Sequence, residues 1–325
     1  MNRRRALSAA LALTAGTVLL SACGKGEAAP LDAAPGSSGA KSKINTSPDQ
    51  HRIHVKKAPD IAAQVPARIR DRGTLRFGLS TGSNPPLGFY ATDDRTLIGV
   101  ERDLATLIAD TLGLKPAFHA LSWENLFVGL DSGKLDGVLS NVTVTEERKD
   151  KYDFATYRLD ELAMEARKGS HWKVRGAKDV AGKKIAVSSG TNQEKILVDW
   201  SKQNEKAGRK PVDITYYQNT SDYYLALRSG RIDAYFGPHP TSAYHVATAG
   251  QTEIVGTFSG GGDQVQGKIA ATTKKDNGLV KPYAAALQHV IDNGAYKKVL
   301  DRWGLANEAV TKSEINPRGL PRTAR

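Results

Sequence analysis

The segment from Ser140 to Arg148 has the residue types needed to bind a small anion. It follows an apolar run, Leu135 to Leu139, that predicts a buried strand, and it places hydroxyl and amide side chains ahead of an arginine. Polar groups at the end of a strand, beside a helix N-terminus and a guanidinium, can receive a carboxylate. A cation in the first turn of a helix opposes the helix dipole, so Arg148 is best explained by an anion facing it. The alternative is a strand, a turn and a helix with a surface arginine.

A second candidate anion site lies between Ser188 and Glu194. A predicted strand ends there, Gly190 permits a tight turn, and Thr191 and Glu194 have the spacing of a capping box. The backbone N–H groups of the helix that begins here would face a ligand beyond the sheet edge. A well-capped helix with no ligand is the alternative interpretation.

Strand and helix patterns alternate along the chain, which predicts an α/β fold with mostly parallel sheets. The expected strands are 74–79, 135–139 and 183–187, and the expected helices are 100–112, 123–130, 192–205, 279–294 and 295–303. One unit occurs twice, from Ser132 to Ser140 and from Ser229 to Gly237, each after a short helix. Two similar lobes would explain the repetition, and the alternative is coincidence, because helix–glycine–strand junctions are common.

The N-terminus predicts export. Three arginines precede an apolar stretch that is too short to span a membrane and that ends at the only cysteine of the chain, Cys23. The pattern resembles a bacterial lipoprotein signal, so residues 1–22 are expected to be removed and Cys23 to be lipidated. A plain secretory signal with an incidental cysteine is the alternative. Residues 23–66 are expected to form a flexible tether, since their first part is rich in Ala, Gly, Ser and Pro.

The charge of the chain does not indicate nucleic-acid binding. Removing the three signal arginines lowers the net charge from +12 to +9, and the remaining basic residues are scattered rather than gathered with aromatics. No sequence motif of a serine hydrolase, a zinc protease or a P-loop is present. We therefore expect no catalytic residue, no cofactor and no metal.

Eleven short motifs along the chain point to one family. They are Gly73-Thr-Leu-Arg-Phe-Gly, Asn84-Pro-Pro, Gly99-Val-Glu-Arg-Asp-Leu-Ala, Ser122-Trp-Glu-Asn-Leu, Ser132-Gly-Lys-Leu-Asp, Val144-Thr-Glu-Glu-Arg, Tyr152-Asp-Phe, Gly182-Lys-Lys-Ile-Ala-Val, Gly190-Thr, Ser229-Gly-Arg-Ile-Asp and Gly294-Ala-Tyr-Lys-Lys. Together they cover about Gly73 to Trp303 and resemble the bacterial extracellular solute-binding proteins of family 3, the amino-acid receptors of ABC importers.

The resemblance implies a two-lobed, periplasmic-binding-protein-like fold of type II, with two hinge crossings, near 159–162 and near 260–266. Lobe 1 would comprise residues 67–162 and 262–325, and lobe 2 residues 163–261. The ligand would lie between the lobes.

The resemblance also implies roles for individual residues. Arg148 would bind the ligand carboxylate, with Thr191 and the backbone N–H groups around Asn192. Thr143 and the backbone around Asn141 would meet an α-ammonium group. Two further residues would form walls of the site: Trp123, which could instead pack under its own helix, and Asn84.

One position departs from the family pattern. Family members usually carry a carboxylate after the strand that follows Gly-Arg-x-Asp, and here Pro238 occupies that position. Proline offers neither a charge nor an N–H group. The ligand would therefore lack a free α-ammonium group, or another acid would take over. Ser80 stands where relatives that bind basic side chains have an acid, which disfavours arginine, lysine and histidine as ligands.

The expected function is binding without chemistry, by a monomeric receptor that is lipid-anchored outside the cytoplasm. It would capture a small carboxylate and dock on the membrane permease of an ABC importer. A dehydratase on the same scaffold is one alternative, and a ligand-presenting sensor module is another.

Overall fold

The computed structural model describes residues 44–80 and 85–322. The expected signal peptide, Cys23 and the first part of the tether lie outside these residues, and so does Asn84. Within the described ranges, no helix combines the length and apolar character that crossing a membrane requires.

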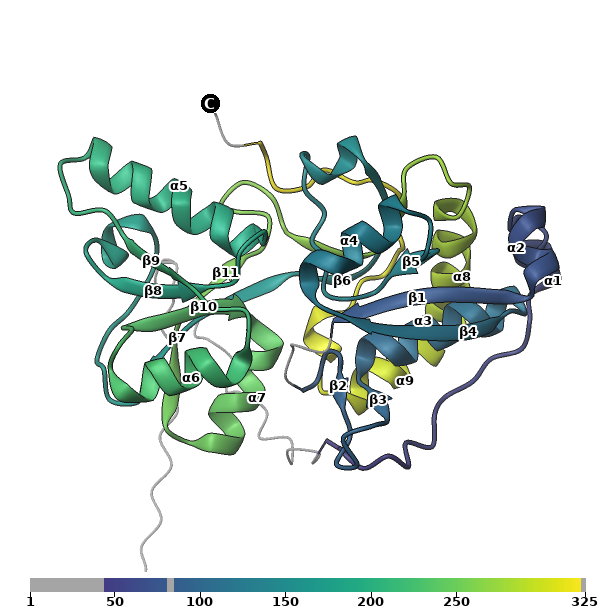
Figure 1. Cartoon of the computed structure of the whole chain (residues 1–325), viewed down its shortest axis with the longest axis horizontal. Helices are drawn as coiled ribbons and strands as arrows, with labels where there is room; N and C mark the ends of the chain where they lie inside the picture. Colours follow the sequence, from purple (N-terminus) through teal and green to yellow (C-terminus); the bar gives the residue numbers. More distant parts are fainter. Residues whose placement is uncertain (1–43, 81–84, 323–325) are drawn as a thin grey trace, which may run out of the picture. The chain divides into compact units, whose positions relative to one another are not determined.

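The described residues form two lobes, each built on a five-stranded sheet (Figure 1). The sheet of the first lobe has the order β4 (Lys115–Leu121), β1 (Thr74–Ser80), β5 (Gly137–Val138), β12 (Lys268–Lys274) and β6 (Tyr152–Leu159). Strand β1 is parallel to β4 and β5, and β12 is antiparallel to β5 and β6. Four strands therefore run in one direction and β12 runs against them, as expected for a mostly parallel sheet.

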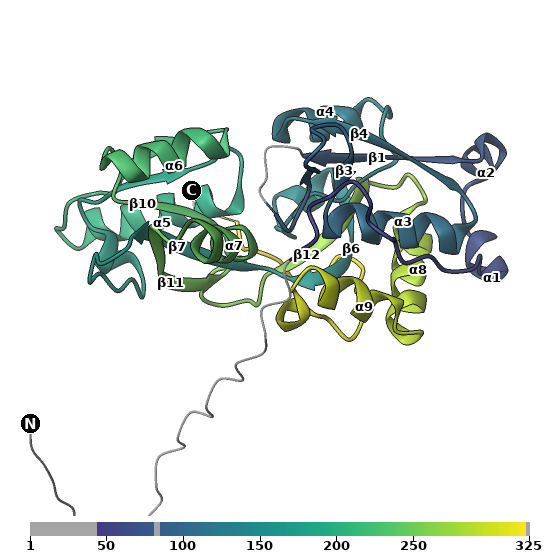
Figure 2. The ribbon, with the colours of Figure 1, turned by 90° about the horizontal axis from the view of Figure 1, so that it is seen from below.

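Helices cover both faces of this sheet (Figure 2). On one face, α3 (Val100–Leu112), α8 (Val280–Asp292) and α9 (Ala295–Arg302) bury the main apolar core of the lobe. On the other face, α4 (Trp123–Asp131) packs its buried leucines over β5. The positions of all four helices agree with the sequence prediction. Short elements complete the lobe: α1 (Pro59–Ala62), α2 (Ala67–Arg72), β2 (Phe89–Tyr90), β3 (Leu97–Ile98), and the 3₁₀ turns η1 (Arg148–Asp150) and η3 (Ala306–Glu308).

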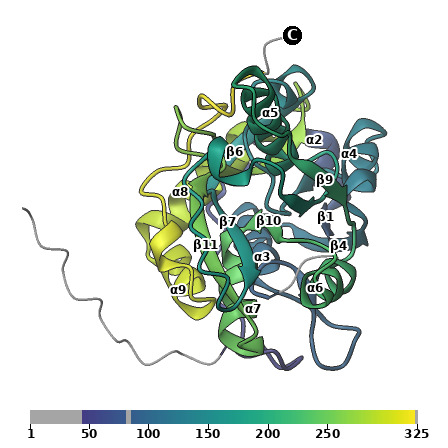
Figure 3. The same cartoon turned by 90° about the vertical axis from the view of Figure 1, so that its left-hand side faces the viewer.

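The second lobe has the same layered plan, which Figure 3 shows end-on. Its sheet has the order β11 (Thr252–Ser259), β7 (Glu161–Arg167), β10 (Ala234–Pro238), β8 (Lys184–Val187) and β9 (Asp213–Tyr216). Helix α5 (Asn192–Lys206) covers one face, while α6 (Thr220–Ser229) and α7 (His239–Ala249) cover the other. A 3₁₀ turn, η2 (Ala177–Val180), packs beside α5.

The chain passes between the sheets at the two expected places. Strand β6 of the first sheet continues through Asp160 into β7 of the second, and β11 returns to β12 through residues 260–267. The two crossings are hydrogen-bonded to each other, because Gly260 N donates to Asp160 O at 2.9 Å and Asp160 N donates to Gly267 O at 2.8 Å.

The repeated sequence unit has a common structural role. Asp136 and Asp233 each follow a helix, and each accepts a hydrogen bond from the backbone of the neighbouring parallel strand. Asp136 Oδ2 accepts from Arg76 N at 2.8 Å, and Asp233 Oδ2 accepts from Lys184 N at 2.9 Å. An aspartate at the equivalent position of each lobe thus binds the backbone of a central strand, so the sequence repeat reflects equivalent architecture in the two lobes.

The structure differs from three sequence-based expectations. Residues 44–66, expected in the tether, pack on the first lobe, where Ala58 N donates to Thr111 O and Val65 is buried. The end of the chain, assigned to lobe 1, also reaches lobe 2, because Leu320 joins its apolar core. Finally, Arg148 begins a three-residue 3₁₀ turn rather than an α-helix. The dipole argument for an anion at Arg148 is therefore wrong, and its role depends on its contacts instead.

Candidate functional site

A cavity of about 350 Å³ lies between the lobes, at the carboxyl ends of strands from both sheets. Ser80 ends β1 and Ser140 follows β5, while Ser188 and Pro238 lie at the ends of β8 and β10. Ligands of open α/β sheets bind at such edges, because loops there present side chains and helix N-termini together. The serines also support each other, since Ser80 N donates to Ser140 Oγ at 2.8 Å.

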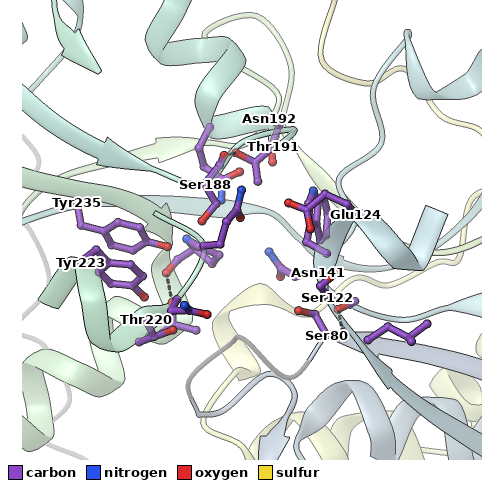
Figure 4. A pocket seen from close by; sticks show the side chains of 18 residues that line it. Ser80, Ser122, Glu124, Asn141, Ser188, Thr191, Asn192, Thr220, Tyr223 and Tyr235 are labelled. Carbon is purple, nitrogen blue, oxygen red and sulfur yellow. Dashed lines mark hydrogen bonds between the residues drawn. The ribbon is translucent and has the colours of Figure 1, made fainter. Parts of the chain in front are cut away.

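The inter-lobe cavity is lined mostly by hydroxyl and amide groups (Figure 4). Among the described residues that line it, Glu124 of α4 is the one with a charged side chain, and it is exposed. Two buried tyrosines of the second lobe, Tyr223 and Tyr235, stack with ring centroids 3.7 Å apart. Burial raises the pKa of Tyr223 to about 12 and that of Tyr235 well above its ordinary value, so both rings are neutral.

Arg148 lies in an adjoining hollow that shares Thr191 and Asn192 with the cavity. Its guanidinium donates to Thr143 O at 2.9 Å in its own lobe and to Gly190 O at 3.0 Å in the other lobe. Burial lowers the pKa of Arg148 to about 10, while Asp160 and Glu147 oppose that change, so the group is charged at neutral pH. The two carbonyls bound to this cation are neutral acceptors.

Aromatic side chains hold the arginine in place. The guanidinium carbon lies 5.3 Å from the ring centroid of Trp123 and 5.6 Å from that of Phe127, within the range of cation–π attraction. Trp123 also reaches across the cleft, because its Nε1 donates to Gly190 O at 3.4 Å. Trp123 therefore combines both interpretations from the sequence: it packs on Phe127 and it forms part of the cavity wall.

The N-terminus of α5 forms the opposite wall. Thr191 caps it by accepting from Glu194 N at 3.2 Å, and Glu194 Oε2 accepts from Gly190 N at 2.6 Å. The predicted cap is thus present, although the glutamate bonds the residue before the cap. The first turn brings Asn192 and Gln193 to the cavity, where the helix dipole favours an anion.

Asn141 is held by a buried ionic cluster within the first lobe, formed by Glu101, Arg158 and Glu308. Its backbone has φ of 52°, which asparagine tolerates better than most residues, and its N–H donates to Glu101 Oε1 at 3.2 Å. Its side-chain oxygen accepts from Arg158, which also pairs with Glu308 and lies 3.4 Å from Glu101. Burial works to lower the pKa of Arg158, but Glu308 and Glu101 outweigh it, so the pKa is raised.

Asp160 occupies the first hinge crossing and links both lobes. Its Oδ2 accepts from Thr143 Oγ1 at 2.7 Å and from Asn192 Nδ2 at 3.1 Å. Burial raises the pKa of Asp160, while these hydrogen bonds and two arginines oppose the rise. Thr143 is fully buried in this contact, so its side chain is not at the cavity wall where a ligand ammonium would meet it.

The structure brings most of the predicted site residues together. Five line the inter-lobe cavity and Arg148 lies beside it, whereas Thr143 is buried at the hinge. The five are Trp123, Asn141, Thr191, Asn192 and Pro238. Sequence reasoning missed Glu124, Tyr223 and Tyr235, because an acid in a first helical turn and tyrosines in α6 and β10 also fit ordinary capping and core roles.

The sequence of the chain matches the model of a known protein family. The model of the bacterial extracellular solute-binding proteins, family 3, matches residues 75–306. The chain is 31% identical to the L-cystine-binding protein TcyJ of Escherichia coli K12, over 73% of this chain and 84% of that protein.

Solved structures of amino-acid-binding proteins are also similar to this chain. An ancestral arginine-binding protein bound to arginine is 30% identical with a TM-score of 0.62, and the match covers 71% of this chain and 98% of that one. The ancestral amino acid-binding protein AncCDT-1, described as a precursor of cyclohexadienyl dehydratase, is 26% identical with a TM-score of 0.61, covering 73% and 97%.

Replacing Arg158 by methionine should destabilise the fold by about 3–5 kcal/mol, because Glu101 and Glu308 would lose the partner of a buried charge cluster. The matched control is Arg322→Met, which removes an exposed ion pair with Asp150 and should cost less than about 1 kcal/mol. Urea unfolding followed by circular dichroism measures both. Equal losses in the two variants would show that the cluster does not stabilise the hinge.

Proposed function

The chain belongs to the bacterial extracellular solute-binding proteins, family 3, and we propose that it is the lipid-anchored amino-acid receptor of an ABC importer. One observation carries the proposal: a polar cavity between two lobes adjoins a guanidinium that is bound only to neutral carbonyls in the contacts described above. A zwitterionic amino acid offers the carboxylate that such a cation lacks.

The carboxylate is proposed to replace Gly190 O as the acceptor of Arg148. A carboxylate can accept two parallel bonds from a guanidinium, and a charged acceptor binds more strongly than a carbonyl. The same carboxylate would also face the first turn of α5 at Thr191 and Asn192, which both the cavity and the Arg148 hollow share. Binding would then join a cation of lobe 1 to a helix end of lobe 2.

The ammonium group is proposed to face Glu124. With Pro238 in the usual acidic position, Glu124 is the charged side chain available among the described cavity residues. Once it pairs with the α-ammonium, no second acid of this lining remains for a cationic side chain, so basic amino acids are disfavoured. The hydroxyl-rich walls and the tyrosine pair suit a polar, uncharged side chain. L-Cystine is the first compound to test, because a relative is named for binding it and because its second ammonium group carries its own carboxylate, so that half of the molecule has no net charge.

Closure of the lobes is the proposed mechanism. An open form would capture the solute, and contacts from the second lobe would then favour the closed form that docks on the permease. A bidentate arginine–carboxylate contact contributes about 2–3 kcal/mol, whereas micromolar affinity needs about 8 kcal/mol. The remaining free energy must come from α5, the walls and the direct contacts between lobes.

A dehydratase would need an acid in the cavity that remains protonated. In the described lining the one carboxyl belongs to Glu124, which is exposed to solvent. This supports binding without turnover, even though a structural neighbour is described as a precursor of a dehydratase.

Arg148→Ala should weaken binding of the amino acid by about 30- to 150-fold, the equivalent of the 2–3 kcal/mol above. Lys149→Ala is the control, because that neighbouring lysine pairs with Glu146 and lines neither the cavity nor the Arg148 hollow. Isothermal titration calorimetry on folded proteins gives the affinities. Unchanged affinity in Arg148→Ala would remove this residue from the site.

In a thermal-shift screen, L-cystine and uncharged polar L-amino acids should stabilise the protein, and arginine and lysine should not. A ligand at 100 times its dissociation constant adds about 2.7 kcal/mol, or roughly 5 °C in Tm. In Glu124→Gln, the Tm shift caused by an amino acid should be smaller than in the parent protein. The Tm shift caused by the analogue that lacks the amino group should be unchanged. Strong stabilisation by arginine, or equal shifts in Glu124→Gln, would contradict the proposed orientation.

Lipidation at Cys23 predicts that the protein partitions with membranes of its host and that Cys23→Ser is released as an unlipidated form. Fractionation and mass spectrometry of the N-terminal peptide test this. Membrane association that survives in Cys23→Ser would show that another segment holds the protein.

A further inference from the structure

Three potential metal ligands from distant parts of the chain meet beside the first hinge crossing. Glu161 is the first residue of β7, His239 is the first residue of α7, and Glu308 lies in η3. Their ligand atoms all lie within 4.8 Å of one another. Nδ1 of His239 is 3.9 Å from Glu161 Oε2 and 3.9 Å from Glu308 Oε1.

One atom of this cluster lacks a partner. The side chain of Glu308 is 0% exposed, and its Oε2 pairs with Arg158. Within the part of the chain that the structure describes, Oε1 accepts no hydrogen bond, although it faces the imidazole. A buried polar atom without a partner is costly and therefore rare in native proteins. Its position indicates that something else binds there.

The charges nearby favour a cation. Asp160 and Glu161 both act on Glu308 as negative charges, and Arg158 is already shared between Glu308 and Glu101. Near Glu308, the acids Asp160, Glu161 and Glu101 thus outnumber Arg158 and Arg148, the two arginines that act on this group of acids. A divalent ion would supply positive charge where desolvated carboxylates need it.

We propose that Glu161, His239 and Glu308 form a binding site for a divalent transition-metal ion of the zinc type, which joins the two lobes beside the hinge. Imidazole nitrogen and carboxylate oxygen are ligands that Zn²⁺ accepts, and three protein ligands leave a position for water. Calcium and magnesium prefer sites made of oxygen alone, so the histidine disfavours them.

The spacing fits an ion after a small adjustment. With two separations of 3.9 Å and a third of at most 4.8 Å, the point in their plane that is equidistant from the three atoms lies at most about 2.5 Å from each, compared with about 2.0–2.2 Å for zinc bound to nitrogen or oxygen. A contraction of a few tenths of an ångström closes that gap.

A metal ion at this position would connect the two lobes. Glu308 belongs to the first lobe, His239 begins a helix of the second, and Glu161 stands at the crossing between them. An ion bound by all three would favour the relative lobe position described here. The site is separate from the solute cavity, because none of the three residues lines it.

Zinc binding can be measured without any solute. The chain without its expected signal peptide, residues 23–325, is prepared with Cys23→Ser, because a free thiol could itself bind Zn²⁺. It is treated with a chelator, dialysed and titrated with Zn²⁺ by calorimetry. We expect one ion per chain. His239→Ala and Glu161→Gln should each weaken binding by at least about tenfold, since loss of even an outer-shell partner costs that much. Glu161 is partly exposed, so that variant tests the site even where another variant fails to fold.

His54→Ala is the control, because His54 also pairs with a carboxylate, Asp110, but at the surface. Its Zn²⁺ affinity should equal that of the parent chain. Absence of Zn²⁺ binding in the parent, or equal affinity in folded Glu161→Gln and His239→Ala, would overturn the proposal. Neither result would bear on amino-acid binding, which is measured in separate titrations.

Discussion

A half-buried cation, whose described side-chain hydrogen bonds go to carbonyls rather than to a carboxylate, governs the arrangement of the site. Arg148 is held between Trp123 and Phe127, and it donates to carbonyls of both lobes. Desolvating a charge is costly unless hydrogen bonds and opposite charges compensate for it. Two neutral carbonyls, with the nearby charges of Asp160 and Glu147, compensate in part, so a carboxylate bonded directly to this guanidinium would still gain free energy.

The hydrogen bond from Arg148 to Gly190 O is also a direct contact between the two lobes. Gly190 O receives donors from both Arg148 and Trp123, and the residue next to it caps α5. A ligand carboxylate that displaced this carbonyl would exchange a direct contact between lobes for one that passes through the ligand. Under the proposed function, binding and closure would therefore be coupled through one acceptor position, while Asp160 and the Arg158 cluster hold the hinge behind it.

Much of the fold could be predicted from the sequence because local patterns determine it. Helix periodicity located α3, α4, α8 and α9, and the cap at Thr191 located α5. The repeated unit was recognisable because one aspartate has the same strand-fastening role in each lobe. The arrangement of residues 44–66 was not predictable, since it depends on contacts with residues farther along the chain, such as the hydrogen bond from Ala58 N to Thr111 O.

The site was predictable only in part, for a similar reason. Residues at strand ends and helix starts, such as Asn141 and Thr191, have local signatures. Thr143 has the same signature, but its hydroxyl is used by Asp160 of the hinge, and nothing near it in sequence reveals that pairing. The expectation of no metal rested on the absence of known sequence motifs. The three residues of the proposed metal site, Glu161, His239 and Glu308, are far apart in the sequence and meet only in the folded chain.

The most direct test is a crystal structure of the protein with the amino acid that the screen identifies. The account predicts that the carboxylate of that ligand accepts from the Arg148 guanidinium in place of Gly190 O, and also faces the first turn of α5. A ligand bound elsewhere, with Arg148 still donating to Gly190 O, would contradict it.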